Sequence, residues 1–340
     1  MRSLLAQAFF LLAGVVGCGR PQGELLNPSG PPIVWPKAPD APRVRYLGQL
    51  RGADDLRPPK SAWQFWQEVI HGPAEPPRLI TPQAVAVHPD GQRVAVADTN
   101  GACVHVFDLA RRRHELKIAC GTGGQRLACP VAVAWAGDTL WVADSKLHAL
   151  VRFPAEGPGR ILGREVLRRP AGLAFCQLNG LCYVTDAALH AVMLFDDQGR
   201  QVAQFGSQGA GPGQFNYPSH VSCAADGTVV VADSLNFRVQ RFSPDGALGG
   251  VFGRKGDAAG DLALPKGVAV DPEGNVWVVD AHFENVQAFT AAGELLMSFG
   301  GEGQGPGEFW LPAGIFIDAR RRIWVADTYN RRVQVFELHG

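Results

Sequence analysis

The segment IWVADTYNRRVQVFE (323–337) has a form that recurs along the whole chain. Two runs of alternating apolar residues, IWVAD and RVQVFE, flank a polar turn, which is the pattern of a β-hairpin. Related segments occupy 94–108, 140–153, 182–196, 229–243 and 276–290. Their shared aspartates, at spacings of 46, 42, 47, 47 and 47 residues, are Asp98, Asp144, Asp186, Asp233, Asp280 and Asp327. Six units at this period indicate a propeller, an array or a solenoid.

Each unit divides further into short strands. Residues 265–300 contain four of them, PKGVAVD, NVWVVD, NVQAFT and ELLMSFG. The turns Pro-Glu-Gly and Ala-Ala-Gly place glycine where the chain must reverse direction. Four-stranded units at this period are typical of propeller blades. The sequence therefore predicts an all-β, six-bladed β-propeller over 43–340.

The repeated pattern resembles a known family. It reads P-x-G-[VI]-A-V-D, then W-V-A-D-[ST]-x-N-x-R-V-Q-V-F, then S-F-G, and it resembles the NHL repeat most closely in the fifth and sixth units. The resemblance covers about residues 80–340 and implies the propeller fold. It implies no particular activity, because NHL propellers serve many roles.

The sixth unit is one strand short. It supplies AGIFID, RIWVAD and RVQVFEL, whereas RVRYLGQL (43–50) resembles the fourth strands of other units. We expect this N-terminal strand to complete the last blade and to remove an exposed sheet edge. Residues 53–80 interrupt the pattern, and PPKSAWQFWQEVIHG within them predicts a short helix capped by Ser61. That helix would pack on the rim, cap the central channel or dock a partner.

The N-terminus indicates export. An apolar run follows Arg2 and is too short to span a bilayer, so residues 1–17 are expected to be a signal peptide. The end of this run, VVGC, resembles the lipobox of bacterial lipoproteins, which implies cleavage before Cys18 and lipidation of that cysteine. Gly19 then favours the outer membrane by analogy, and an ordinary secretory signal is the alternative. Residues 18–42 are rich in proline and glycine and predict a semi-stiff tether.

Composition narrows the choice of partners. The chain has 32 basic and 32 acidic residues, which argues against general nucleic-acid binding. In an exported chain the cysteines can oxidise. Cys176 and Cys182 flank an Asn-Gly turn and predict a disulfide across a hairpin. The pairing of Cys103, Cys120, Cys129 and Cys223 stays open.

Histidines are the strongest candidates for chemistry. First-strand starts, turns between second and third strands, and inter-blade loops should share one face of the propeller. His148, His190 and His282 fall in such turns, and His220 falls at the start of an inner strand, facing the channel. The pattern resembles the peptide-amidating lyase, a propeller in which converging histidines hold zinc. Only one inner-strand position fits here, so no metal and no cofactor is predicted.

Two further groups could bind partners. The first group lies on the same face as His220. It consists of aromatic and arginine side chains of the kind enriched at interfaces, namely Phe237, Arg238, Phe283, Trp310, Tyr329 and Arg331. Arginines on the opposite face predict a basic seam where the first and last blades meet: Arg93, Arg111, Arg112, Arg113, Arg320, Arg321 and Arg322. Packing between blades and solvated turns are the structural alternatives for these two groups.

The predicted role is therefore binding. The sequence favours a lipid-anchored scaffold of the bacterial cell envelope that recognises one or more envelope proteins and touches the membrane through Cys18. The alternatives are a metal-dependent lyase or hydrolase at the channel mouth, and a sensor of a small ligand. No serine-nucleophile elbow or metalloprotease motif occurs, which makes an enzyme the weaker expectation.

Overall fold

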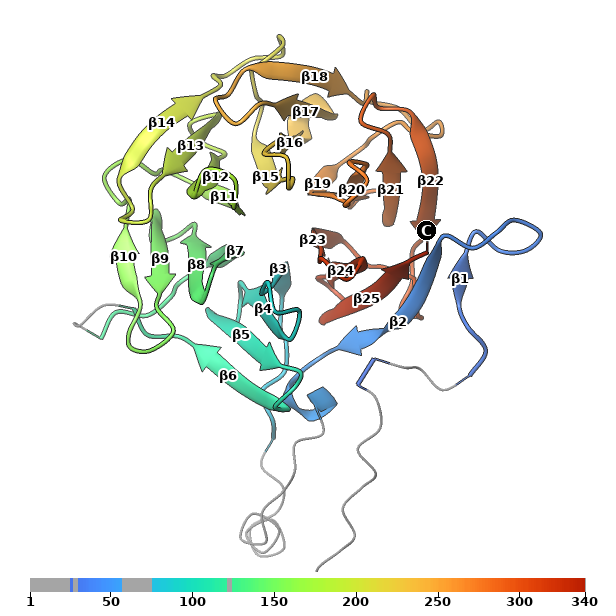
Figure 1. The fold of residues 1–340 in the computed structure, drawn as a ribbon, viewed down its shortest axis with the longest axis horizontal. Coiled ribbons are helices and arrows are strands. Elements are labelled where there is room, and N and C mark those ends of the chain that lie inside the picture. Colours follow the sequence, from blue (N-terminus) through green and yellow to red (C-terminus); the bar gives the residue numbers. More distant parts are fainter. Residues whose placement is uncertain (1–24, 27–29, 57–74, 121–123, 340) are drawn as a thin grey trace, which may run out of the picture.

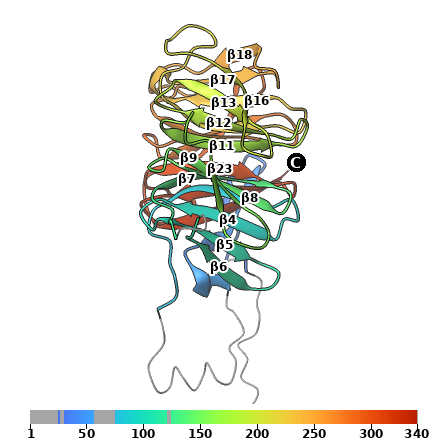
Figure 2. The same ribbon diagram turned by 90° about the vertical axis from the view of Figure 1, so that its left-hand side faces the viewer.

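The computed structural model describes residues 25–26, 30–56, 75–120 and 124–339. Its strands form six antiparallel sheets arranged as blades around a central axis (Figure 1). In side view the ring is flattened along that axis (Figure 2). The predicted all-β, six-bladed propeller is confirmed.

The first three blades follow one another along the chain, each with its first strand innermost. Blade one contains β3 (Pro82–Val87), β4 (Arg93–Asp98), β5 (Cys103–Asp108) and β6 (Arg113–Lys117). Blade two contains β7 (Pro130–Ala136), β8 (Thr139–Asp144), β9 (Ala149–Phe153) and the short β10 (Arg160–Leu162). Blade three contains β11 (Pro170–Cys176), β12 (Leu181–Asp186), β13 (Ala191–Phe195) and β14 (Gln201–Phe205).

The remaining blades complete the ring. Blade four contains β15 (Pro218–Cys223), β16 (Val229–Asp233), the 3-10 turn η2 (Ser234–Asn236), β17 (Arg238–Phe242) and β18 (Leu248–Phe252). Blade five contains β19 (Pro265–Val270), β20 (Val276–Asp280), β21 (Asn285–Phe289) and β22 (Leu295–Gly300). Blade six contains β23 (Pro312–Ile317), β24 (Arg322–Asp327) and β25 (Arg332–Leu338), with β2 (Val44–Leu50) and β1 (Val34–Trp35) added from the N-terminal side.

The second strands are the most buried because neighbouring blades cover both of their faces. In VWVVD of β20 every residue is buried, and in RIWVAD of β24 all but the first are. Separate apolar clusters fill the spaces between adjacent blades. Between blades six and one, for example, Trp324 packs in one cluster with Phe107 and Leu50. Apolar burial of this kind, repeated around the ring, is what holds the blades together.

The N-terminal strand closes the ring, as the sequence predicts. β2 pairs antiparallel with β25 from Val44 opposite Leu338 to Leu50 opposite Val333. Figure 1 shows β2 as the outer strand beside β25, on the same blade as the C-terminus. The backbone N–H and C=O groups of β25 on this side are therefore paired within the chain.

Two faces of the disc follow from this topology. The starts of the first strands, the turns between second and third strands and the inter-blade loops lie on one face, here called the top face. The turns between first and second strands and between third and fourth strands lie on the bottom face.

The repeated aspartates are structural, as predicted. Asp98 accepts hydrogen bonds from the amides of Ile80 and Thr81 at 2.6 and 2.9 Å, and Asp327 accepts from the amide of Trp310 at 2.8 Å. Each carboxylate thereby ties the end of a second strand to the loop that precedes its own blade. All six are fully buried: Asp98, Asp144, Asp186, Asp233, Asp280 and Asp327.

Part of the predicted tether lies on the propeller. β1 pairs with β2, and the Trp35 ring lies 5.5 Å from the Phe299 ring and 5.8 Å from the Phe336 ring. Burial of this large aromatic surface favours the contact over free extension.

The predicted signal peptide, Cys18 and the predicted helix at 61–70 lie outside the described residues, whereas η1 (Ala53–Leu56) buries Leu56 in the core. Within the described residues no helix is long and apolar enough to cross a membrane.

The predicted disulfide between Cys176 and Cys182 is not formed, and both thiols are free. The Asn-Gly turn places Cys176 opposite Leu181, and Cys182 opposite Phe175. The two cysteines are therefore one position out of register, and their side chains enter different core clusters on opposite faces of the sheet. The thiol of Cys176 instead lies beside that of Cys223 on the neighbouring inner strand.

Candidate functional site

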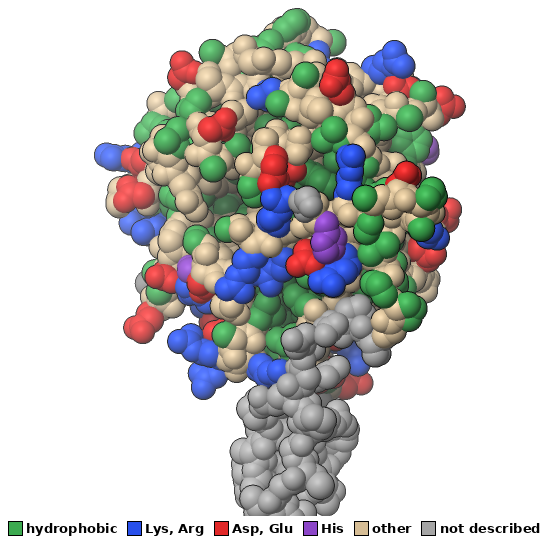
Figure 3. All heavy atoms as spheres, turned by 45° about the vertical axis from the view of Figure 1, so that its right-hand side comes forward, with side chains coloured by type: hydrophobic (Ala, Val, Ile, Leu, Met, Phe, Trp, Pro, Cys, Tyr) green, Lys and Arg blue, Asp and Glu red, His purple; other side chains and the backbone are tan. Residues whose placement is uncertain are grey.

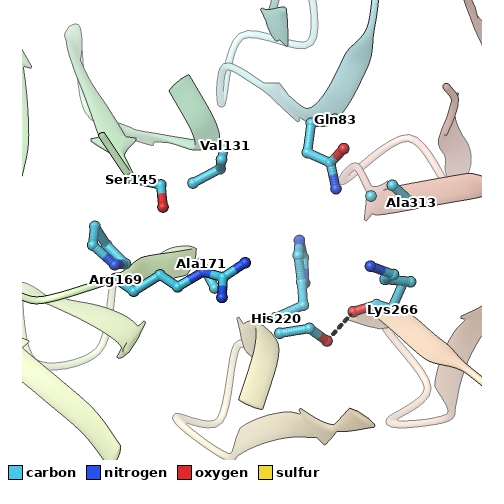
Figure 4. A pocket seen from close by; sticks show the side chains of 11 residues that line it. Gln83, Val131, Ser145, Arg169, Ala171, His220, Lys266 and Ala313 are labelled. Atoms are coloured by element: carbon cyan, nitrogen blue, oxygen red, sulfur yellow. Dashed lines mark hydrogen bonds between the residues drawn. The ribbon is translucent and has the colours of Figure 1, made fainter. Parts of the chain in front are cut away.

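A cavity of about 170 Å³ opens on the top face at the central axis, and it is here called the axial cavity. It is lined by Gln83, Val131, Ser145, Arg169, Pro170, Ala171, Ser219, His220, Lys266, Ala313 and Gly314. Figure 4 shows these side chains converging from all around the ring. Every one of the six blades contributes to the wall, so the cavity exists only in the closed propeller.

A bulge at the start of each first strand explains the lining. The pairing register shifts directly after the first proline, as between Pro218 and His220 in blade four and between Pro265 and Gly267 in blade five. The residue inside each bulge leaves the ladder and faces the axis. The six bulges supply Gln83, Val131, Ala171, Ser219, Lys266 and Ala313.

Two cations face the cavity without an anion. Lys266 comes from β19, and Arg169 directly precedes β11. Within the part of the chain that the structure describes, neither side chain forms an ion pair, and no Asp or Glu lines the wall. Burial lowers the pKa of Lys266, and the charge of Arg169 lowers it further. The cavity is therefore a region of uncompensated positive charge.

His220 lies in this cavity, as the sequence predicts. Its Nδ1 accepts a hydrogen bond from the Val268 amide at 3.4 Å, so the proton of the neutral ring is on Nε2. Burial holds the pKa of His220 down at about 4. The ring is neutral at pH 7 and presents an N–H donor toward the axis, between Arg169 and Lys266 (Figure 4).

The other predicted histidines lie away from the cavity. His190 is buried, accepts a hydrogen bond from the Tyr217 amide at 3.2 Å and packs edge-on against the Tyr217 ring. His148 and His282 are exposed, and Nδ1 of His148 contacts the carbonyl oxygen of Arg168. His190 therefore has a structural role, and the four histidines do not converge.

The predicted contact residues of the top face fall into two classes. Arg238 is committed to the fold: it bonds Asp233 at 2.8 Å and the carbonyl oxygens of Ala210, Gly211 and Gln214, all at 2.8 Å. It is not a free contact, because these acceptors use most of its donors. The second class consists of side chains that are exposed or partly exposed, namely Phe237, Phe283, Trp310, Tyr329 and Arg331. Of these, Phe237 lies under the Lys255 ammonium at 5.1 Å.

Trp310 and Tyr329 form an exposed aromatic pair on blade six. Their ring centroids are 5.5 Å apart, and 43 % and 56 % of their surfaces are exposed. Large aromatic side chains that share a contact yet remain in solvent are typical of recognition surfaces. The pair is the most accessible aromatic feature of the top face among the described residues.

The basic seam on the bottom face is assembled, and four of its seven arginines pair with a carboxylate. Arg322 of blade six reaches the Gly91 carbonyl oxygen of blade one at 2.8 Å, which confirms that the two blades meet there. The same arginine pairs with Asp318 at 2.7 Å, and Arg93 pairs with Asp90 at 2.8 Å and Asp138 at 2.5 Å. Figure 3 shows charges of both signs interspersed over the face it presents. Of the remaining members, Arg111 pairs with Asp108 and Arg321 with Glu273. Arg112 and Arg320 donate to the carbonyl oxygens of Leu56 and Asp90, and Arg113 is exposed.

The environment of His220 is unfavourable for a metal ion. Its neighbours in the cavity are the cations Arg169 and Lys266, which would repel a divalent cation. Across the described residues, no group of three or more His, Cys, Asp and Glu side chains is placed to hold a metal. The arrangement favours the binding of negative charge.

Comparisons with known proteins agree with the fold. The NHL repeat model matches residues 309–336. No curated protein sequence matches the chain. Among solved structures, virginiamycin B lyase from Staphylococcus aureus is 16% identical, with a TM-score of 0.55 over 76% of this chain and 95% of that one.

Two binding proteins have a similar architecture. An auxiliary nutrient binding protein from Bacteroides thetaiotaomicron is 12% identical, with a TM-score of 0.58 over 77% of this chain and 70% of that one. A chain of the nidogen/laminin complex is 17% identical, with a TM-score of 0.55 over 74% of this chain and 89% of that one. At such identities the likeness concerns the fold alone. The chain carries an NHL repeat and is a six-bladed β-propeller.

Proposed function

We propose that the protein is a binding module of the cell envelope whose top face docks a protein partner. One observation carries the proposal. Among the described residues, seven of the twelve large exposed hydrophobic side chains lie on the top face, and only Leu178 lies on a bottom turn. The seven are Ile80, Leu189, Tyr217, Leu235, Trp310, Leu311 and Tyr329.

This asymmetry is not required by the fold. Blade packing buries the faces of the sheets, and the loops of both faces could have been equally polar. The four other exposed hydrophobic side chains lie on fourth strands at the outer rim, namely Val202, Leu248, Val251 and Leu296. Apolar and aromatic side chains are gathered on the loops of one face. A partner that covers them removes them from water at little desolvation cost, which favours docking on this face.

The envelope location rests on the sequence. The apolar segment before Cys18 and its lipobox-like end support export and anchoring at a membrane, and Gly19 supports a place at the outer membrane. The nutrient-binding and nidogen/laminin structures support the use of this fold for binding. The alternative of a metal-dependent lyase is less favoured, because cations surround His220.

The aromatic pair provides the test of this proposal. We expect Trp310→Ala with Tyr329→Ala to weaken capture of the native partner by about tenfold or more, because buried aromatic anchors dominate interface energies. The measurement is affinity capture of the full chain from detergent-solubilised membranes, with quantitative mass spectrometry. Leu178→Ala is the matched control, since it removes an exposed apolar side chain from the bottom face. Undiminished capture by the double variant, with loss in the control, would contradict the proposal.

A further inference from the structure

The axial cavity carries charge that the fold does not use. Several other arginines of the described residues pair with a carboxylate: Arg332 with Asp327 at 2.7 Å, Arg322 with Asp318 at 2.7 Å and Arg254 with Asp261 at 2.7 Å. Arg169 and Lys266 have no such partner in the described chain, although they are close enough for the charge of one to lower the pKa of the other. Like charges held together without an anion destabilise the protein. A ligand that supplied the anion would remove that repulsion.

The donors in the cavity suit an oxyanion. The Arg169 guanidinium offers a planar fork of N–H groups, the Lys266 ammonium offers a compact charge, and the Nε2–H of His220 offers a neutral donor. Figure 4 shows these three groups pointing toward one another across the axis. Ser219 is already engaged, because its hydroxyl donates to the Lys266 carbonyl oxygen at 2.7 Å. Its bond helps to fix the backbone from which the Lys266 side chain extends.

The size of the cavity limits what enters it. About 170 Å³ corresponds to roughly five or six water molecules at about 30 Å³ each. A carboxylate or phosphate group with its immediate substituents fits in this space, whereas a larger ligand must leave most of its body on the top face.

The geometry points to an oxyanion site in the axial cavity, where Arg169, Lys266 and the Nε2–H of His220 bind a carboxylate or phosphate group of whatever docks on the top face. This inference rests on the proposed function and makes it more specific. The apolar side chains of the top face contact the body of the partner, and the cavity at its centre receives one negative group.

Direct titration of the full-length protein tests the site. Succinate and inorganic phosphate are the two probes, titrated by calorimetry at low ionic strength, with sodium chloride of matched ionic strength as the reference. We expect at least one probe to bind with a stoichiometry of one, and the preference between them to distinguish a carboxylate from a phosphate ligand. No binding beyond the chloride reference by either probe would overturn the inference.

Variants separate the site from general charge effects. Arg169→Gln and Lys266→Gln are each expected to weaken binding of the preferred probe by about tenfold, because each removes a charged hydrogen-bond donor. Without probe, neither variant should lower the melting temperature, since each relieves the repulsion between the two cations. Lys146→Gln and Arg200→Gln, which remove exposed cations outside the cavity, should bind like the unaltered protein. Equal weakening in these controls would contradict a specific site.

The two proposals can fail independently. Loss of partner capture in the Trp310/Tyr329 variant without any probe binding would overturn the oxyanion site and leave the docking face standing. Probe binding that depends on Arg169 and Lys266, with partner capture insensitive to the aromatic pair, would support the oxyanion site and contradict the docking face.

Discussion

Replacing Arg332 by methionine is expected to lower the free energy of unfolding by about 3–5 kcal/mol. Arg332 is 1 % exposed and bonds Asp327, which is fully buried, at 2.7 Å. It also donates to Gln49 on the closing strand at 3.0 Å and to the carbonyl oxygens of Gly305 and Glu308 at 2.9 and 2.8 Å. One guanidinium therefore ties together β24, β2 and the loop between blades five and six. Methionine fills similar space but removes one donor from each of these acceptors and the charged partner from a buried carboxylate.

Equilibrium urea unfolding followed by tryptophan fluorescence measures this loss. Arg331→Met is the matched control, because Arg331 is exposed and its replacement should change stability by less than about 0.5 kcal/mol. Adding Asp327→Asn to Arg332→Met should cost less than the sum of the two single changes, since it removes the orphaned charge. If the free energy of unfolding of Arg332→Met lies within about 0.5 kcal/mol of that of the unaltered protein, the buried pair does not hold the last blade.

Removing the closing strand is expected to have a still larger effect. A chain that begins at Arg51 lacks β1 and β2 and loses the buried side chains of Val44, Tyr46 and Leu50. At about 1.5–3 kcal/mol for each fully buried side chain, the loss is roughly 5–9 kcal/mol, comparable with the whole stability of many domains. It also exposes β25 as a free edge, which promotes aggregation. We expect this chain to be largely unfolded or aggregated.

The control for this deletion is a chain that begins at Gly30, which keeps both strands. Circular dichroism and size-exclusion chromatography compare the two chains. A synthetic peptide of residues 30–51 added to the shorter chain should restore folding, because it can pair with β25 in trans. A monomeric shorter chain with an unchanged unfolding midpoint would contradict the role of β2 in ring closure.

Most of the fold could be predicted because its signals repeat. The six aspartates, the alternating strands and the missing fourth strand of the last unit together define the ring and its closure. The disulfide prediction was wrong for a local reason. An Asn-Gly turn fixes the direction reversal, but a shift of one position in register moves a side chain to the opposite face, and the pairing puts Cys176 opposite Leu181.

The site was only partly predictable from the sequence. The position of His220 was assigned to the cavity correctly, but Lys266 and Arg169 were missed. The repeated proline at the start of each first strand starts a bulge, and the residue after it faces the axis. Reading the P-x-G pattern for its middle residue would have found Lys266. Arg169 precedes the proline, and only the three-dimensional path of the inter-blade loop brings its side chain to the axis.

The central claim is that the top face is the binding face, and footprinting in intact cells tests it most directly. Hydroxyl radicals oxidise exposed side chains, and mass spectrometry compares the protein in cells with the purified protein. The account predicts that oxidation of Trp310, Tyr329 and Tyr217 falls several-fold in cells while Leu178 on the bottom face is unchanged. Equal oxidation of the three aromatic residues in both settings, with protection at Leu178, would contradict it.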